Sequence, residues 1–163
     1  MRVCFQRIHP AAKLPSQNHP TDAGYDVYAA LDNPVIIPPG GQVLISSGFN
    51  VGIQPDPNQF YSWTGSGNVD ILNYVWVIDV RSRSGLAAKN RVFVTNAPGT
   101  VDQNYRGELK VILFNAGKTD YIVEPGDRIA QLVVTKAFLP AFVEVESLDE
   151  TDRGTKGFGS SGN

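Results

Sequence analysis

Short apolar runs separated by glycine and proline dominate the chain. Residues 38–41 (PPGG), 65–68 (GSGN), 115–118 (NAGK) and 124–127 (EPGD) are typical of turns. The runs between the turns are rich in β-branched and aromatic residues and predict strands: VCFQRI, QVLISS, DILNYVWVIDV, RVFVTN, ELKVILFN, RIAQLVV and AFVEVES. Short strands with regular turns predict an all-β barrel or sandwich.

Helical periodicity is missing from most of the chain. Only SGLAAKN, residues 84–90, is expected to form a short helix. In ELKVILFN, residues 108–115, alternate positions point to opposite faces of a strand. Because both sets of positions are mostly apolar, we expect this strand to be buried on both sides.

Composition places the chain among single-domain globular proteins. It has 163 residues, of which 42% are hydrophobic and 18% charged, enough for a core. A net charge of −2 gives no basic bias for nucleic acid, so a polyanionic ligand would need local positive charge or a metal ion. One cysteine, no signal-like start and no membrane-length apolar stretch predict a cytoplasmic protein without membrane or nucleic-acid partners.

Two common nucleotide-binding motifs fail their structural tests. GFGSSG, residues 157–162, matches G-x-G-x-x-G, but the chain stops before the helix that this motif requires. No G-x-x-x-x-G-K-[ST] loop is present, and His9 and His19 lack metal-ligand spacing.

Five polar segments interrupt the strands, and the first two carry charge beside glycine. In DAGYDVYAA, residues 22–30, Gly24 permits a bend next to the Asp26 carboxylate, although such a segment alone is usually a turn with a solvated aspartate. In RSRSGLA, residues 81–87, a Ser-Gly step at a helix start beside Arg83 fits either a phosphate cradle or an ordinary capped helix.

The third segment, NAPGTVDQNYRGELK at 96–110, reads as a loop between two strands. Asp102 in this loop could orient a water molecule, and Tyr105 could pack on a flat ligand or a sugar. A turn aspartate beside a boundary tyrosine is the alternative.

The last two segments are GDRIAQLVV at 126–134 and the glycine-rich tail. Gln131 interrupts an apolar strand and must find a partner in backbone, another subunit or a ligand. In the tail, Arg153 could bind phosphate and Phe158 could stack on a base, whereas a disordered terminus is the alternative.

Together, and in this order, the five segments resemble the motifs of the trimeric deoxyuridine triphosphate nucleotidohydrolases, or dUTPases. The matching residues are 23–26 (AGYD), 83–87 (RSGLA), 99–107 (GTVDQNYRG), 126–132 (GDRIAQL) and 153–162 (RGTKGFGSSG). The resemblance implies a distorted jelly-roll-like β-barrel with one short helix, assembled as a homotrimer. It further implies a barrel domain at 1–148 and a flexible C-terminal lid at 149–163.

The resemblance also implies an activity, the hydrolysis of dUTP to dUMP and pyrophosphate at sites shared between subunits. Asp102 would activate the water that attacks the α-phosphorus, and Mg²⁺ would be held mainly by the triphosphate. Asp26 would contact the metal through water. The triphosphate would be held by Arg83, Ser84, Gly85 and Gln131.

The remaining implied roles concern the base, the sugar and the lid. Uracil would be read by the backbone near Gly99, Thr100, Val101 and Lys110, together with the amide of Asn96. Tyr105 would pack under the deoxyribose. The lid would close with Arg153, Gly159, Ser160 and Ser161 on the phosphates and Phe158 over the uracil.

This chain departs from the family pattern chiefly by an insertion at 54–76. Two smaller departures are Ser82, where the family usually has proline, and Lys156, where it often has glycine. The insertion predicts an aromatic-rich hairpin turning at 65–68. We expect it to form a strand pair packed on its own barrel, and the alternative is an exposed patch that binds a protein partner.

Two rival functions remain to be weighed. A dCTP deaminase of the same fold would need a glutamate on the strand after the hairpin, and residues 110–114 (KVILF) contain no carboxylate. A dUTPase-like regulatory protein that binds a partner is the other alternative. Asp102→Asn separates these ideas, because hydrolysis should collapse while a partner function should survive.

Overall fold

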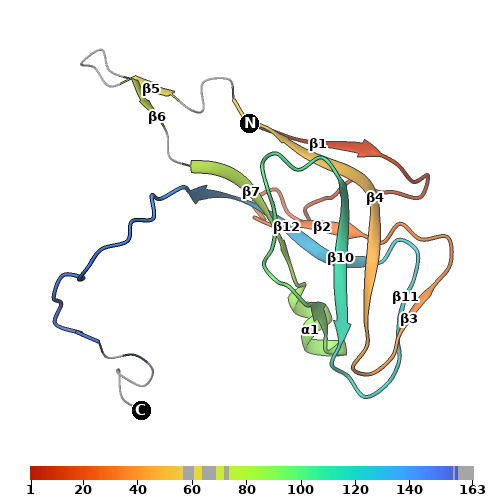
Figure 1. Ribbon diagram of the computed structural model, residues 1–163. Coiled ribbons are helices and arrows are strands. Elements are labelled where there is room, and N and C mark those ends of the chain that lie inside the picture. Colours follow the sequence, from red (N-terminus) through yellow and green to blue (C-terminus); the bar gives the residue numbers. More distant parts are fainter. Residues whose placement is uncertain (57–60, 64–68, 72–73, 156, 158–163) are drawn as a thin grey trace.

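Two four-stranded antiparallel sheets form the body of the molecule in the computed structural model (Figure 1). The structure describes residues 1–56, 61–63, 69–71, 74–155 and 157, with the backbone alone for 61–63 and 69–71. The elements in the described part are β1 (Arg2–Arg7), β2 (Tyr25–Tyr28), β3 (Val35–Ile37), β4 (Gln42–Gln54), β5 (Tyr61–Trp63), β6 (Val69–Ile71), β7 (Tyr74–Arg81), α1 (Ser84–Asn90), β8 (Val92–Val94), β9 (Gly99–Val101), β10 (Glu108–Asn115), β11 (Tyr121–Val123) and β12 (Arg128–Phe138).

One sheet has the order β1-β4-β10-β8 and the other the order β2-β12-β7-β9. Two further pairs, β3 with β11 and β5 with β6, complete the topology of the described residues. Neighbours in each sheet come from distant parts of the chain, as in a jelly roll. The prediction of an all-β fold with one short helix at 84–90 is confirmed.

The core lies between the two sheets and consists almost wholly of aliphatic side chains. Its largest fully buried members are Ile37, Ile45, Ile53, Ile78, Leu109, Leu113 and Ile129. Strand β10 contributes Leu109, Val111 and Leu113 from one face, whereas its other face carries exposed Lys110 and half-buried Ile112 and Phe114. The expected burial of this strand on both sides is therefore wrong, because the strand belongs to an antiparallel sheet with a single core-facing side.

Asn115, at the end of β10, is a buried polar residue with all its side-chain groups bonded. Its Nδ2 donates to the carbonyl oxygens of Ile37 and Thr119, each at 2.8 Å, and its Oδ1 accepts from Gly117 N at 2.8 Å. These bonds tie β10 to β3 and to the turn that leads into β11, which closes one end of the barrel.

The chain after β12 extends away from the barrel (Figure 1). The predicted strand AFVEVES at 141–147 is wrong, since these residues form no strand and are exposed. None of the described strands pairs with their backbone, and an isolated strand has no hydrogen-bond ladder to stabilise it.

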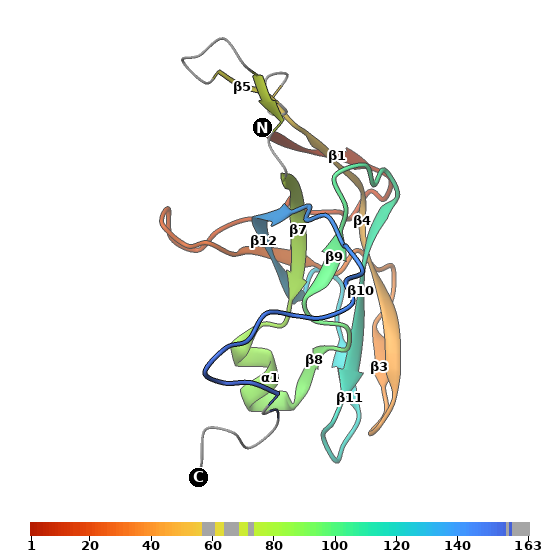
Figure 2. The same ribbon diagram turned by 60° about the vertical axis from the view of Figure 1, so that its left-hand side comes forward.

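The segment at 54–76, expected from the sequence to be an insertion, contains the predicted hairpin pairing. Strands β5 and β6 pair antiparallel with Tyr61 opposite Ile71 and Trp63 opposite Val69. The pair projects beyond the end of the barrel in both views instead of packing on it as expected (Figures 1 and 2). The predicted turn at 65–68 lies outside the described residues, and so does Phe60. Within the described part of the chain, no helix has the length and apolar character needed to cross a membrane.

Candidate active site

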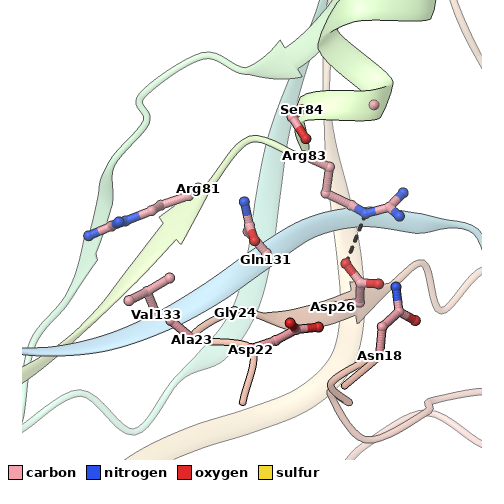
Figure 3. Close-up of a pocket in the computed structure, with 11 residues that line it drawn as sticks. Asn18, Asp22, Ala23, Gly24, Asp26, Arg81, Arg83, Ser84, Gln131 and Val133 are labelled. Carbon is pink, nitrogen blue, oxygen red and sulfur yellow. Dashed lines mark hydrogen bonds and ion pairs between the residues drawn. The ribbon is translucent and has the colours of Figure 1, made fainter. Parts of the chain in front are cut away.

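A polar cleft of about 440 Å³ lies where β2, the end of β7, the start of α1 and β12 meet (Figure 3). It gathers five predicted site residues from three separate segments of the chain. Its lining consists of Asn18, Asp22, Ala23, Gly24, Asp26, Arg81, Arg83, Ser84, Gly85, Gln131 and Val133. We call it the arginine cleft.

Asp26 pairs with two arginines, Arg83 in the lining of this cleft and Arg128 outside the lining. Its Oδ1 accepts from Arg83 Nε at 2.9 Å and its Oδ2 from Arg128 Nη1 at 3.1 Å. Arg83 Nη1 also donates to the carbonyl oxygen of Arg128 at 3.0 Å. Because the Asp26 side chain is only 16% exposed, these contacts hold the Arg83 guanidinium in a defined place.

Gln131 lies in β12 between Asp26 of β2 and Arg81 of β7, its partners in register. Its Nε2 donates to the carbonyl oxygen of Ser82 at 3.0 Å. A Cβ on Gly24 would collide with the Gln131 side-chain oxygen, so glycine there lets the two segments approach. The polar residue within this apolar strand therefore finds a backbone partner, one of the options expected from sequence.

The start of α1 opens onto the same cleft. Arg83 precedes the helix in an extended conformation, and Ser84 and Gly85 form its first turn, whose N–H groups have no partner within the helix. A Cβ on Gly85 would meet nothing within 4 Å, so the backbone there is open to a ligand.

A second cleft of about 440 Å³ surrounds the hairpin formed by β9 and β10, and we call it the hairpin cleft. It brings together every site residue predicted from the third segment. Its lining consists of Leu44, Val80, Asn96, Gly99, Thr100, Val101, Asp102, Tyr105, Glu108, Leu109, Lys110 and Ile112.

Asp102 and Tyr105 are the ends of one turn in this cleft. Tyr105 N donates to the carbonyl oxygen of Asp102 at 3.0 Å, and the tyrosine hydroxyl donates to the carbonyl oxygen of Glu108 at 2.8 Å. A Cβ on Gly107 would lie 2.6 Å from that hydroxyl, so glycine leaves room for the ring. The turn exposes the Asp102 carboxylate at the cleft.

Glu108 is a cleft residue that sequence reasoning missed. It accepts a hydrogen bond from the Ser46 hydroxyl and pairs with Lys110 Nζ at 3.0 Å. Burial raises the pKa of Glu108, but the bonds from Ser46 and Lys110 outweigh it and leave this pKa below its usual value. The alternation of a strand places residues 108 and 110 on one face, and this signal could have revealed the pair. Sequence analysis also missed three residues that line the arginine cleft, namely Asn18, Asp22 and Arg81.

The two clefts share no lining residue. Within the described part of one chain, Asp26, Arg83 and Gln131 are thus gathered apart from Asp102 and Tyr105. Arg153 is exposed in a turn at 152–155 of the extended tail. The other predicted lid residues, Phe158, Gly159, Ser160 and Ser161, lie outside the described residues.

Metal-ligand chemistry is sparse in the described residues. They contain no group of three or more His, Cys, Asp or Glu side chains able to hold a metal ion. Both Asp26 oxygens already accept from arginines, which leaves contact through water as the fitting mode for a cation.

The structure is thus a small antiparallel β protein with one cleft that offers arginine and open helix N–H groups and another that offers a carboxylate and a tyrosine ring. Comparison with known proteins narrows this class. The family model described as dUTPase matches residues 77–162. The deoxyuridine 5′-triphosphate nucleotidohydrolase of Rhodococcus erythropolis is 42% identical over 163 residues, which cover 99% of this chain and 87% of that protein.

Further relatives indicate the same family. The Helicobacter pylori J99 protein of the same name is 40% identical over 162 residues, covering 99% of this chain and 97% of that one. Among solved structures, the dUTPase of Staphylococcus bacteriophage 80alpha with dUPNHPP matches at a TM-score of 0.77 and 26% identity, with 99% of each chain covered. The chain belongs to the dUTPase family.

Proposed function

We propose that this protein is a dUTP diphosphatase that hydrolyses dUTP to dUMP and pyrophosphate. The observation that carries this conclusion is the full-length similarity of about 40% identity to deoxyuridine 5′-triphosphate nucleotidohydrolases. The reaction removes dUTP before it enters DNA and supplies dUMP for dTMP synthesis. A dCTP deaminase is disfavoured because β10 carries no carboxylate after Glu108 at its start.

A homotrimer would join the two clefts. Hydrolysis requires the uracil, the attacking water and the phosphates at one place, whereas the hairpin cleft and the arginine cleft of one chain are separate. If the arginine cleft of one copy faces the hairpin cleft of another, all the groups meet in an intersubunit site.

Exposed apolar surface supports such assembly. Phe142 is 95% exposed and Leu148 83% exposed in the extended segment that follows β12. An apolar groove of about 810 Å³ on the barrel includes Val3, Phe5 and Leu132 in its lining. Apolar surface of this kind favours burial against another copy of the chain.

Uracil recognition belongs to the hairpin cleft. The backbone of Gly99, Thr100 and Val101 and that of Lys110 would read the edge of the base, with the Asn96 amide beside it. A Cβ on Gly99 would lie 2.9 Å from Asn96 Nδ2, so this glycine keeps the amide close to β9. A narrow hairpin rejects the thymine methyl by steric exclusion and cytosine by its reversed donor and acceptor groups.

Asp102 would act as the base. Its carboxylate accepts a proton from the water whose oxygen attacks the α-phosphorus, and the bond from that phosphorus to the bridging oxygen of the pyrophosphate breaks. Tyr105 would pack beneath the deoxyribose, held there by its bond to the Glu108 carbonyl oxygen.

The arginine cleft would hold the triphosphate. Arg83, fixed by Asp26, supplies positive charge, while Ser84 and Gly85 offer a hydroxyl and open N–H groups. Gln131 would stand near the α-phosphate. Mg²⁺, bound mainly by phosphate oxygens and reached by Asp26 through water, would offset the charge of the leaving pyrophosphate.

The tail would serve as the lid of a third copy. In this proposal residues 1–148 form the barrel domain and 149–163 the lid, with Arg153, Gly159, Ser160 and Ser161 on the phosphates and Phe158 over the uracil. The single, half-buried Cys4 is consistent with a reducing compartment, and the cytoplasm is the proposed location.

A second candidate function is binding of a protein partner through the insertion. The observation that favours it is the projection of β5 and β6 beyond the barrel (Figures 1 and 2). The matched phage 80alpha protein is described as controlling transfer of virulence genes. Asp102→Asn would leave such binding intact while abolishing hydrolysis.

The test of the proposed activity is pyrophosphate release from dUTP, dCTP, dTTP and UTP, each with and without Mg²⁺. Turnover of dUTP alone, increased by Mg²⁺, is expected. Equal turnover of dTTP or UTP would contradict the hairpin mechanism. No turnover by folded protein would refute the enzyme assignment.

A further inference from the structure

The turn that carries Asp102 is tied to the strand that leaves the insertion. Strand β9 pairs with β7 only up to Val101, which lies opposite Ile78. Beyond this point the chain turns away from β7, so β9 offers no backbone acceptor to Trp76. The side chain of Gln103 takes the place of that acceptor. Its Oε1 accepts from the N–H of Trp76 at 2.9 Å.

The same turn is tied to the strand that enters the insertion. Arg106 Nη1 donates to the carbonyl oxygen of Gln103 at 3.0 Å, and its Nη2 donates to that of Ile53 at 3.3 Å. A Cβ on Gly52 would lie 2.9 Å from Arg106 Cδ, so glycine makes room for this side chain. Ile53 directly precedes the insertion and Trp76 is its last residue, and we call these two residues the insertion root.

Two hydrogen bonds join the turn to this root, one from Trp76 to Gln103 and one from Arg106 to Ile53. An open hollow of about 580 Å³ lies beside them and is lined by Ile53, Pro55, Val75, Asp102, Gln103, Asn104 and Arg106. Because side chains do not fill this hollow, the bond from Trp76 is a main restraint beside Asp102.

Trp76, which donates the hydrogen bond to Gln103, is itself held in place by its neighbours. Trp76 lies in β7 opposite Lys136 of β12, and the Lys136 ammonium lies 5.1 Å from the centre of the tryptophan ring. Tyr74 packs edge-on against the same ring at 6.0 Å. The N–H that Gln103 accepts from therefore belongs to a fixed strand.

We propose that Gln103 is a positioning residue that holds the Asp102 carboxylate in place through the insertion root. This inference rests on the proposed function. Gln103 adjoins Asp102, and a shift of about 1 Å in a reacting group can lower a rate by up to about 100-fold. The side-chain amide thus links the insertion to the step in which water loses its proton.

Binding of the base does not depend on this link. The uracil-reading strand β9 is held by its own ladder with β7, and Tyr105 is held by the Glu108 carbonyl oxygen. Loss of the Gln103 bond is therefore expected to lower kcat for dUTP while KM stays nearly constant.

The test compares Gln103→Ala, Gln103→Glu and Asn104→Ala in the full chain. Asn104 is the matched control, an exposed neighbour in the same turn. Gln103→Ala is expected to lower kcat about tenfold. KM and the affinity for dUpNHpp should change less than about twofold, because the lost restraint matters only in the transition state. Gln103→Glu retains an acceptor oxygen for the N–H of Trp76 and is ionised at neutral pH, so its kcat should recover relative to Gln103→Ala.

Several outcomes would overturn the inference. They are a kcat of Gln103→Ala equal to that of Asn104→Ala, a parallel rise in KM, or no recovery in Gln103→Glu. Thermal unfolding of each variant shows whether it remains folded. If the unaltered protein hydrolyses dUTP and Asp102→Asn is inactive while Gln103→Ala is fully active, only this inference fails. If the unaltered protein is inactive, the proposed function itself fails.

Discussion

Asp26→Asn tests the electrostatic design of the arginine cleft. The substitution removes the negative charge that pairs with Arg83 at 2.9 Å and with Arg128 at 3.1 Å. A hydrogen bond to a charged group contributes about 1.5–3 kcal/mol, and the larger exposure of Arg128, at 42%, reduces its share. We expect a net loss of about 2 kcal/mol, because asparagine keeps one acceptor oxygen for Arg83.

Thermal unfolding and pyrophosphate release measure the two consequences. For a chain of this size, about 2 kcal/mol lowers Tm by about 4–8 °C. Because a neutral asparagine holds the Arg83 guanidinium less firmly than a carboxylate does, we expect kcat/KM for dUTP to fall by up to about 100-fold. Asp32→Asn is the control, because its carboxylate is 82% exposed and lies 3.5 Å from His9 Nε2, so Tm and activity should stay unchanged.

Added salt distinguishes the partly buried ion pair of Asp26 and Arg83 from an exposed ion pair. The Asp26 side chain is 16% exposed, so the difference in Tm should persist at about 0.5 M salt, where exposed pairs are screened. An unchanged Tm together with unchanged kcat/KM in Asp26→Asn would refute the assignment of Asp26 as the anchor of Arg83.

Three further predictions concern individual residues. Gly107→Ala should raise KM for dUTP about tenfold, because its Cβ would displace the Tyr105 hydroxyl, and steady-state kinetics measure it. Asn115→Ala should lower the free energy of unfolding by about 2–4 kcal/mol in urea titration, since one buried and two partly buried hydrogen bonds are lost. The pKa of Glu108 is lower in the folded state than its unfolded value near 4.5. The ionised Glu108 carboxylate therefore stabilises the folded state above pH 4.5, and this stabilisation is lost as pH falls through the folded pKa. Glu108→Gln should make the free energy of unfolding decline less steeply in this range.

Local patterns predicted most elements of the fold because the governing interactions are local. The helix at 84–90 follows from its composition, and the strands follow from apolar runs between turns. The run at 141–147 has the same composition but forms no strand, since a strand also needs a neighbour that sequence cannot supply.

The grouping of site residues was predictable only in part. The motifs identified Asp26, Arg83 and Gln131, but their meeting in one cleft depends on β12 lying between β2 and β7. The contact of Gln103 with Trp76 was beyond prediction, because a side chain there takes the place of a backbone acceptor from a strand 27 residues away. The separation of the two clefts likewise follows from topology.

The central claim is that dUTP is hydrolysed where the hairpin cleft of one copy meets the arginine cleft of another. Asp102→Asn and Arg83→Ala should each be inactive alone. When the two variants are unfolded, mixed in equal amounts and refolded, random assembly of a cyclic trimer should restore about a quarter of the sites, because each restored site takes Asp102 from one chain and Arg83 from another. No recovery of pyrophosphate release in refolded mixed trimers would contradict a site shared between copies.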